Sequence, residues 1–183
     1  MNLPLTPVRF LRYAEKQFSN KTAVVCQEQR FSYAQFADRA ARLAGGLRAA
    51  GVKAGDRVAF LSMNCHRLLE AYFGVLDAGA VLVPLNYRLA SHELSYILND
   101  SGANKLFLGQ EFVGLVDSFR TKLTGVDSYH LLDATPQAEW LEAQNYEQLL
   151  AAATPHRAEI TSFDENSLCE LFTRAAPAPI PKA

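Results

Sequence analysis

The sequence contains little that could hold a metal or a disulfide framework. Its 183 residues include only three cysteines and four histidines. No C-x-x-C pair occurs, and no histidine lies three or four residues from another histidine or a cysteine, which is the usual spacing of zinc ligands. We therefore expect no metal site, and we interpret Cys26, Cys65 and Cys169 as reduced thiols.

Long apolar runs and an excess of one charge are also absent. No run of about 18 apolar residues could form a transmembrane segment, and Met1–Asn20 carries four charged side chains where a signal peptide needs an apolar block. The default expectation is a cytoplasmic protein. Eighteen Lys and Arg residues against nineteen Asp and Glu residues leave a net charge of −1, which gives no chain-wide field for a nucleic-acid backbone or an anionic membrane.

What the sequence does contain, 49% hydrophobic and 20% charged residues, is ordinary for a soluble globular protein. Strand-like and helix-like segments alternate, which predicts a mostly parallel sheet flanked by helices. The expected strands are a hairpin of Thr22–Cys26 and Arg30–Ser32, then Val58–Met63, Ala80–Leu85, Lys105–Gly109, Tyr129–Leu132 and Ser167–Phe172. Four helices are expected to begin at a cap at Thr6, a capping box of Ser32 and Gln35, a cap at Asn64, and Ser91. Two more are expected over Phe112–Leu123 and Asn145–Ala153.

Two long segments resemble one enzyme family. Gly74–Asn104, GVLDAGAVLVPLNYRLASHELSYILNDSGAN, closely resembles the AMP-forming acyl-CoA synthetases of the adenylate-forming superfamily, and RFSYAQFADRAARLAGGLRAAGVKAGDRVAFLSMN resembles that family's opening. The resemblance covers Lys21–Gly109 in the expected order. It implies the N-terminal subdomain of the acyl-CoA synthetase-like fold, with a helical arm at 1–20, an α/β subdomain of an AMP-binding domain at 21–172, and an altered phosphate-loop remnant forming a flexible tail at 173–183.

The resemblance implies a two-step reaction. In the family, a carboxylate attacks the α-phosphate of Mg–ATP to give an acyl-adenylate and pyrophosphate, and the thiol of coenzyme A then displaces AMP. The sequence VPLNYRL is more similar to the ligases of fatty and other carboxylic acids than to amino-acid-activating modules. The implied partners are therefore ATP with Mg²⁺, coenzyme A and a small carboxylate, and the implied context is fatty acid metabolism.

In this chain, the segment at the place of the family's phosphate loop differs from the family's sequence pattern. The family has [ST]-S-G-[ST]-T-G-x-P-K-[GA] after an apolar strand, whereas here LCELF at Leu168–Phe172 is followed by TRAAPAPI and then PKA. Two prolines within TRAAPAPI have no N–H to donate, and no glycine or hydroxyl side chain follows Thr173. Thr173 and Lys182 remain as vestigial phosphate-binding candidates, and we expect this segment to bind ATP phosphates weakly or not at all.

Arg88 follows the strand VLVPL, where open α/β sheets place ligands, and is the candidate contact for a nucleotide or coenzyme A phosphate. Tyr72, Phe73 and Tyr96 lie at helical core spacing and are interpreted as packing residues. No residue can be assigned a catalytic role.

These features favour an N-terminal fragment of an AMP-dependent acyl-CoA ligase, either truncated or from an interrupted gene, that is inactive as an isolated chain and holds no cofactor tightly. One alternative is a non-catalytic binding or assembly module that forms a homodimer through exposed apolar surface. Another is a free-standing nucleotide-binding domain of flavodoxin or Rossmann type. The dinucleotide version of that domain is disfavoured because no G-x-G-x-x-G follows an expected strand.

Overall fold

Four parallel strands form the centre of the fold in the computed structural model, which describes residues 4–133, 138–142 and 144–172. The order in the sheet is β4-β3-β5-β6. The register aligns Val58 with Leu82 on one side of β3, and Phe60 with Phe107 on the other. The strands are β3 Arg57–Leu61, β4 Val81–Pro84, β5 Ala103–Leu108 and β6 Ser128–Leu131.

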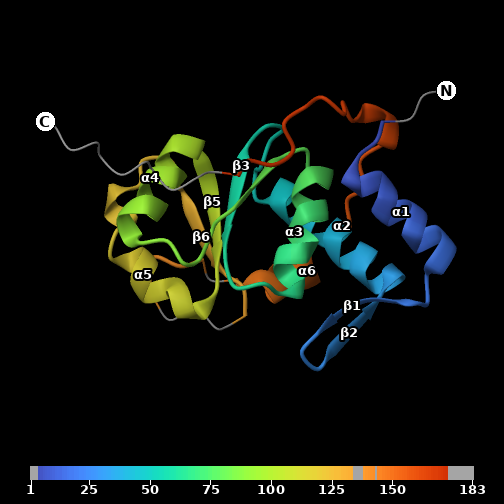
Figure 1. Ribbon diagram of the computed structural model, residues 1–183, viewed down its shortest axis with the longest axis horizontal. Helices are drawn as coiled ribbons and strands as arrows, with labels where there is room; N and C mark the ends of the chain where they lie inside the picture. The colour runs from blue at the N-terminus through green and yellow to red at the C-terminus, as the bar shows by residue number, and fades with distance from the viewer. Residues whose placement is uncertain (1–3, 134–137, 143, 173–183) are drawn as a thin grey trace, which may run out of the picture.

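Helices cover both faces of this sheet, so the predicted fold class is confirmed. Figure 1 shows α2, α3 and α6 on one side of the strands and α4 and α5 on the other. This arrangement follows from the βαβ crossovers, which place each connecting helix on a face of the sheet. The helices are α2 Tyr33–Ala49, α3 His66–Asp77, α4 Ser91–Ser101, α5 Val113–Asp117 and α6 Tyr146–Ala152.

The strands are buried on both faces, as the continuous apolar run after the Gly-Asp turn predicts. Val58 and Phe60 of β3 belong to the core beneath α2, α3 and α6. Ala59 and Leu61 point to the opposite face and belong to the core beneath α4 and α5. The ring of Phe60 stacks on that of Phe107 from β5, with centroids 4.7 Å apart, which ties the two central strands together.

The N-terminal elements lie on the outside of this sandwich. Helix α1, Pro7–Phe18, starts at Thr6, whose hydroxyl accepts a hydrogen bond from the Arg9 amide at 3.3 Å, and packs against α2 and α3. Strands β1, Thr22–Cys26, and β2, Gln29–Ser32, pair antiparallel in the predicted hairpin. The predicted capping box of Ser32 and Gln35 at the start of α2 is also confirmed.

Two expected helix details are wrong. Helix α3 begins after Cys65, not Asn64, and no side chain caps it. The helix expected over Phe112–Leu123 is divided into a 3-10 turn at Gln110–Phe112, the short α5, and a second 3-10 turn at Arg120–Lys122. At the end of α5 the Ser118 hydroxyl donates to the Leu115 carbonyl oxygen at 2.6 Å. This bond competes with the backbone hydrogen bonds that would continue the helix.

The last expected strand, Ser167–Phe172, is reduced to a single parallel bridge between Glu170 and Leu82 of β4. The Leu82 amide donates to the Cys169 carbonyl oxygen at 3.1 Å, and the Leu171 amide donates to the Leu82 carbonyl oxygen at 2.9 Å. The chain therefore runs beside β4 in the same direction, but it pairs too briefly to count as a strand.

Helices α2 and α3 lie close together at Gly74. A Cβ atom at this position would lie 2.7 Å from the Ala40 carbonyl oxygen and 2.8 Å from the Leu43 side chain. We expect Gly74→Ala to lower the free energy of unfolding by about 1–2 kcal/mol, because overpacking against a backbone oxygen outweighs the gain in helix propensity. Urea unfolding would measure the change.

Gly114→Ala is the matched control for this prediction. Gly114 lies in α5 with open space around its missing Cβ atom. The same substitution should therefore be neutral or stabilise the protein by up to about 1 kcal/mol. Equal effects of the two substitutions would contradict the close approach at Gly74.

Candidate functional site

The carboxyl ends of β3, β5 and β6 open into a cavity of about 830 Å³. In the sheet, β4 lies on one side of β3, and β5, the next strand in sequence, lies on the other side of β3. The carboxyl ends of β3 and β5 therefore form a topological switch point, the place where open α/β sheets bind ligands. The walls are the loop 62–67 after β3, Gly109 and Glu111 after β5, Leu132 and Asp133 after β6, and the hairpin turn 25–29.

The cavity wall carries hydrogen-bonding groups of both kinds. Arg67 and Asn64 supply donors, and Glu111 and Asp133 supply carboxylates. The Asp133 carboxylate already accepts a hydrogen bond from the Gln110 amide, at 3.4 Å. This arrangement can bind a polar small molecule.

The same wall contains no catalytic cluster. Cys65 and His66 both line the cavity, but the His66 side chain is buried and its Nε2 lies 3.8 Å from Glu147, not against the thiol. Nothing among residues 4–133, 138–142 and 144–172 groups three or more His, Cys, Asp or Glu side chains in a way that could hold a metal ion.

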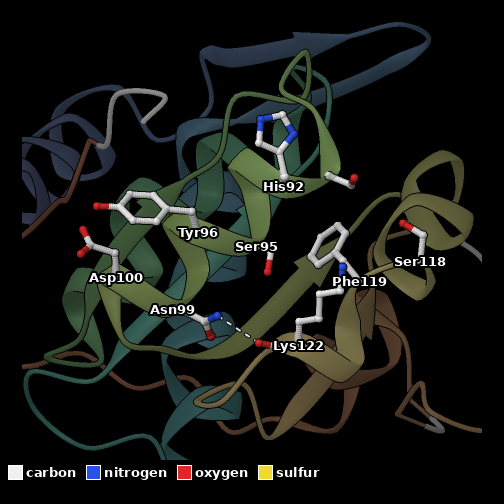
Figure 2. Close-up of a pocket in the computed structure, with 9 residues that line it drawn as sticks. His92, Ser95, Tyr96, Asn99, Asp100, Ser118, Phe119 and Lys122 are labelled. Atoms are coloured by element: carbon white, nitrogen blue, oxygen red, sulfur yellow. Dashed lines mark hydrogen bonds between the residues drawn. The ribbon is translucent and has the colours of Figure 1, made fainter. Parts of the chain in front are cut away.

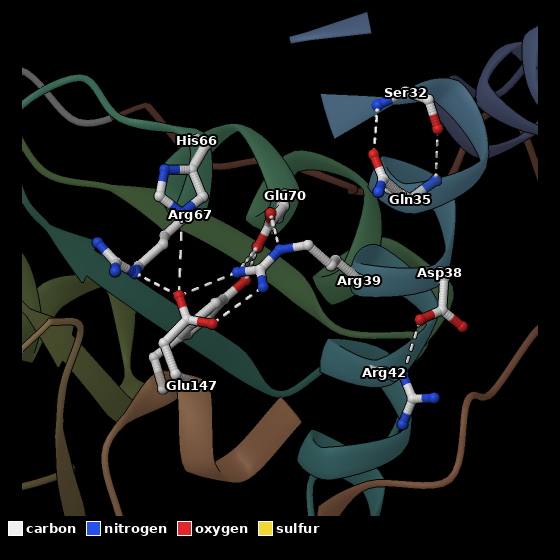
Figure 3. A network of polar contacts seen from close by, with 10 residues as sticks. Ser32, Gln35, Asp38, Arg39, Arg42, His66, Arg67, Glu70 and Glu147 are labelled. Carbon is white, nitrogen blue, oxygen red and sulfur yellow. Dashed lines mark hydrogen bonds and ion pairs between the residues drawn. The ribbon is translucent and has the colours of Figure 1, made fainter. Parts of the chain in front are cut away.

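A charged network lies directly behind the cavity and joins three helices (Figure 3). The Arg39 guanidinium of α2 donates to both carboxylate oxygens of Glu70 in α3, at 2.6 and 3.2 Å. It also donates to both oxygens of Glu147 in α6, at 2.9 and 3.0 Å. Arg67 Nε donates to Glu147 at 2.8 Å, and the Tyr146 hydroxyl donates to Glu70 at 2.6 Å. The network fixes α6 against α2 and α3.

Burial and pairing shift the pKa values of this network in opposite directions. Burial alone would raise the pKa of Glu147, but the His66, Arg39 and Arg67 side chains lower it well below its usual range. Burial alone would lower the pKa of Arg39, but its two carboxylate partners, Glu147 and Glu70, raise that pKa above the usual range. Burial, followed by the neighbouring Glu70 carboxylate, raises the pKa of Tyr146. At neutral pH the network therefore holds a protonated Arg39 and an ionised Glu147 near the neutral phenol of Tyr146.

A second hollow, of about 610 Å³, lies on the outer side of α4 (Figure 2). Asn99 on its wall is already hydrogen-bonded, because its amide donates to the Lys122 carbonyl oxygen at 3.0 Å and its oxygen accepts from the Thr124 amide at 2.9 Å. Tyr96 lies on its wall with 51% of its surface exposed, so its interpretation as a packing residue is wrong.

The residues predicted as contacts are not brought together. Arg88 lies at the carboxyl end of β4 as expected, but it is exposed, its amide donates to Asn86 at 3.0 Å, and its guanidinium lies 5.6 Å from the Tyr87 ring centre. It is not among the residues that line the switch-point cavity. Thr173 and Lys182 lie outside the described residues. All three assignments therefore stay predictions.

Sequence reasoning missed both the cavity and the network behind it. Polar residues directly after three expected strands, such as Asn64, Glu111 and Asp133, were a usable signal for the cavity, because parallel strands end at one edge. The network gave no signal, because Arg39 lies 31 residues from Glu70 and 108 residues from Glu147.

Comparisons with known proteins agree with this architecture. The chain is 30% identical over 182 residues to 4-hydroxybutyrate–CoA ligase 2 of Metallosphaera sedula, covering 97% of this chain and 33% of that protein. It is 35% identical over 177 residues to a long-chain-fatty-acid–CoA ligase of Thermus thermophilus, covering 94% of this chain and 31% of that protein. The chain spans about a third of the length of these relatives.

Solved structures give the same relationship. The anthranilate CoA ligase AuaEII in complex with anthranoyl-AMP superposes with a TM-score of 0.82 at 26% identity, over 93% of this chain and 32% of that chain. The N-terminal domain of FACL13 from Mycobacterium tuberculosis superposes with a TM-score of 0.76 at 27% identity, over 94% of this chain and 41% of that chain. The AMP-binding enzyme family matches residues 11–172. The chain therefore belongs to the AMP-binding enzyme family and corresponds to an N-terminal portion of its acyl-CoA ligases.

Proposed function

We propose that this chain forms the N-terminal part of a ligase that activates a carboxylic acid with ATP and transfers the acyl group to coenzyme A. The observation that carries the proposal is the family match over residues 11–172, which spans the whole parallel sheet and both of its cores. The names of the two curated relatives add support, because both are carboxylate–CoA ligases. The switch-point cavity supplies a polar edge of the kind on which such sheets bind ligands.

We further propose that the isolated chain does not complete this reaction. Mg²⁺ bound with ATP needs only one or two carboxylates beside the phosphates, so the fit depends on the segment that would cradle the phosphates. After Thr173 the chain contains no glycine and no hydroxyl side chain, so this segment lacks the small residues that let backbone N–H groups cradle phosphates. No catalytic step is therefore assigned to the residues of this chain. Fatty or other small carboxylic acids remain the proposed substrate class.

Isothermal titration with Mg–ATP, AMP and coenzyme A, together with a pyrophosphate-release assay on several carboxylates, tests both proposals. We expect no saturable binding of Mg–ATP tighter than about 1 mM and no pyrophosphate above the blank. A variant with TSGSTG in place of Thr173–Ala178 should bind Mg–ATP more tightly if the altered loop is the main defect. Saturable binding or pyrophosphate release by the unaltered chain would contradict the proposed inactivity.

Self-association as an assembly module is the second candidate function. It is favoured by Leu168 and Phe172, which are 55% and 71% exposed beside the edge strand β4. Exposed apolar side chains at a sheet edge are a common route to pairing between chains. The mass in solution, measured in the same titration samples, separates this candidate from the ligase.

A further inference from the structure

The hollow on the outer side of α4 lies between this helix and the segment that follows α5 (Figure 2). Ser95 and Tyr96 of α4 form one wall, and Lys122 of the second 3-10 turn forms the opposite one. The ring of Phe119, which is 2% exposed, also lines the hollow. At about 610 Å³, the hollow lies within the size range of small-molecule sites.

Hydrogen bonds hold the two walls of the hollow together. Asn99 of α4 binds the Lys122 carbonyl oxygen and the Thr124 amide, and its side-chain oxygen also accepts from the Thr124 hydroxyl at 3.2 Å. The Lys122 amide donates to the Phe119 carbonyl oxygen at 2.8 Å, which closes the turn. The hollow is therefore formed without a ligand, so a ligand would bind with little loss of conformational freedom in the walls.

Several polar side chains that line the hollow have no partner. Within the described part of the chain, no hydrogen bond or ion pair engages the side chains of Ser95, Asp100 or Lys122. Ser95 is only 8% exposed, and a buried hydroxyl usually has a partner. Figure 2 shows the Ser95 hydroxyl and the Lys122 side chain pointing into the hollow, whereas Asp100 lies on the far side of Tyr96. These groups can therefore bind a polar ligand.

Opposite charges lie at the two ends of the hollow. Lys122 and Asp100 are the charged side chains among its lining residues, and His92 is titratable. Charged neighbours outside the lining are already engaged: Arg120 with Asp117 at 2.7 Å, and Glu93 with the Ala90 amide at 2.9 Å. Asp100 lies five residues after Ser95, which is about 7.5 Å along the helix axis. A ligand that reaches both groups must carry a negative and a positive charge at least about 7 Å apart.

From these unpaired groups and their charges, we propose that this hollow, the α4 site, binds a small ω-amino carboxylate, a zwitterion whose two charges lie at opposite ends of an apolar body. The ligand's carboxylate pairs with Lys122 and accepts a hydrogen bond from Ser95. Its ammonium pairs with Asp100, and its body packs against the rings of Tyr96 and Phe119. The α4 site shares no lining residue with the switch-point cavity and does not depend on the proposed ligase function.

NMR titration of the full chain with 4-(aminomethyl)benzoate tests the proposal. Backbone amides of residues 91–100 and 118–124 should shift saturably, with a Kd of about 5 mM or tighter. The analogue 4-methylbenzoate lacks the ammonium and benzylamine lacks the carboxylate, so each should bind at least about threefold more weakly. Lys122→Met should weaken binding of the zwitterion and of 4-methylbenzoate by a similar factor, but not binding of benzylamine. Asp100→Asn should weaken binding of the zwitterion and of benzylamine, but not binding of 4-methylbenzoate.

Lys53→Met is the matched control, because it removes an exposed cation that does not line the hollow, and it should leave the titration unchanged. Urea unfolding of each variant identifies any loss of folded protein. The absence of a saturable shift up to about 50 mM, or equal affinities of Lys122→Met and Lys53→Met, would overturn the proposal. Shifts confined to residues 62–67 and 109–111 would also overturn it and would assign the ligand to the switch-point cavity. None of these outcomes depends on ligase activity.

Discussion

Replacing Arg39 by methionine is expected to lower the free energy of unfolding by about 3–5 kcal/mol. The substitution removes the only cation that contacts Glu70 within the described residues, and Glu70 is fully buried. The Tyr146 hydroxyl still donates to Glu70, but one neutral donor does not compensate for a buried charge. Glu147 is affected less, because Arg67 remains bound to it.

Urea unfolding at pH 7 measures this effect. The control is Asp38→Ala on the same helix, which removes an exposed ion pair with Arg42 and should change stability by about 0.5 kcal/mol or less. Adding Glu70→Gln to Arg39→Met should recover part of the loss, because no charge is then left buried. A loss of less than about 1 kcal/mol for Arg39→Met, or no recovery in the double variant, would contradict the structural role assigned to the network.

Lowering the pH from about 6.5 to about 4 is expected to reduce stability by up to about 3 kcal/mol through His130 alone. This side chain stacks on Phe107, with ring centroids 4.6 Å apart. Burial, followed by the nearby charge of Lys105, lowers the pKa of His130 from 6.5 to about 4. Because the folded pKa lies below the unfolded one, the unfolded state takes up the proton first as the pH falls. The stabilisation is therefore complete above about pH 6.5 and is lost toward pH 4.

The pH dependence of urea unfolding between pH 7 and pH 4.5 isolates this effect from the carboxylates, which titrate mainly below that range. His130→Phe keeps a ring against Phe107 and removes the titrating group, so its stability should be nearly flat over the same interval. His130→Gln serves as a second variant if phenylalanine does not fit. Identical slopes for the wild type and both variants would show that His130 does not titrate as described.

The parallel sheet could be predicted because local sequence determines it. The run Val58–Leu61 is apolar throughout, and such a run after a Gly-Asp turn is typical of a strand buried on both faces. The capping box of Ser32 and Gln35 was predictable for a similar reason, since both of its hydrogen bonds join residues that are only three positions apart in the sequence. Predictions failed where a distant partner or a competing local bond decides the outcome. Tyr96 follows the core spacing of α4, yet it lies at the edge of the buried stripe and faces solvent.

The candidate site was less predictable than the fold because tertiary proximity creates it. Glu147 looks like an ordinary acidic residue in the first turn of a short helix, and only the packed structure places it against Arg39 and Arg67.

The bridge between Leu82 and Glu170 has a consequence for the order in which the protein is assembled on the ribosome. All four strands of the central sheet and the helices that cover it precede Asp164 in the chain. Because synthesis proceeds from the N-terminus, the sheet can form before Glu170 leaves the exit tunnel. We therefore expect the last described segment to dock on an edge that has already formed. Until it arrives, β4 remains an open edge on the nascent chain.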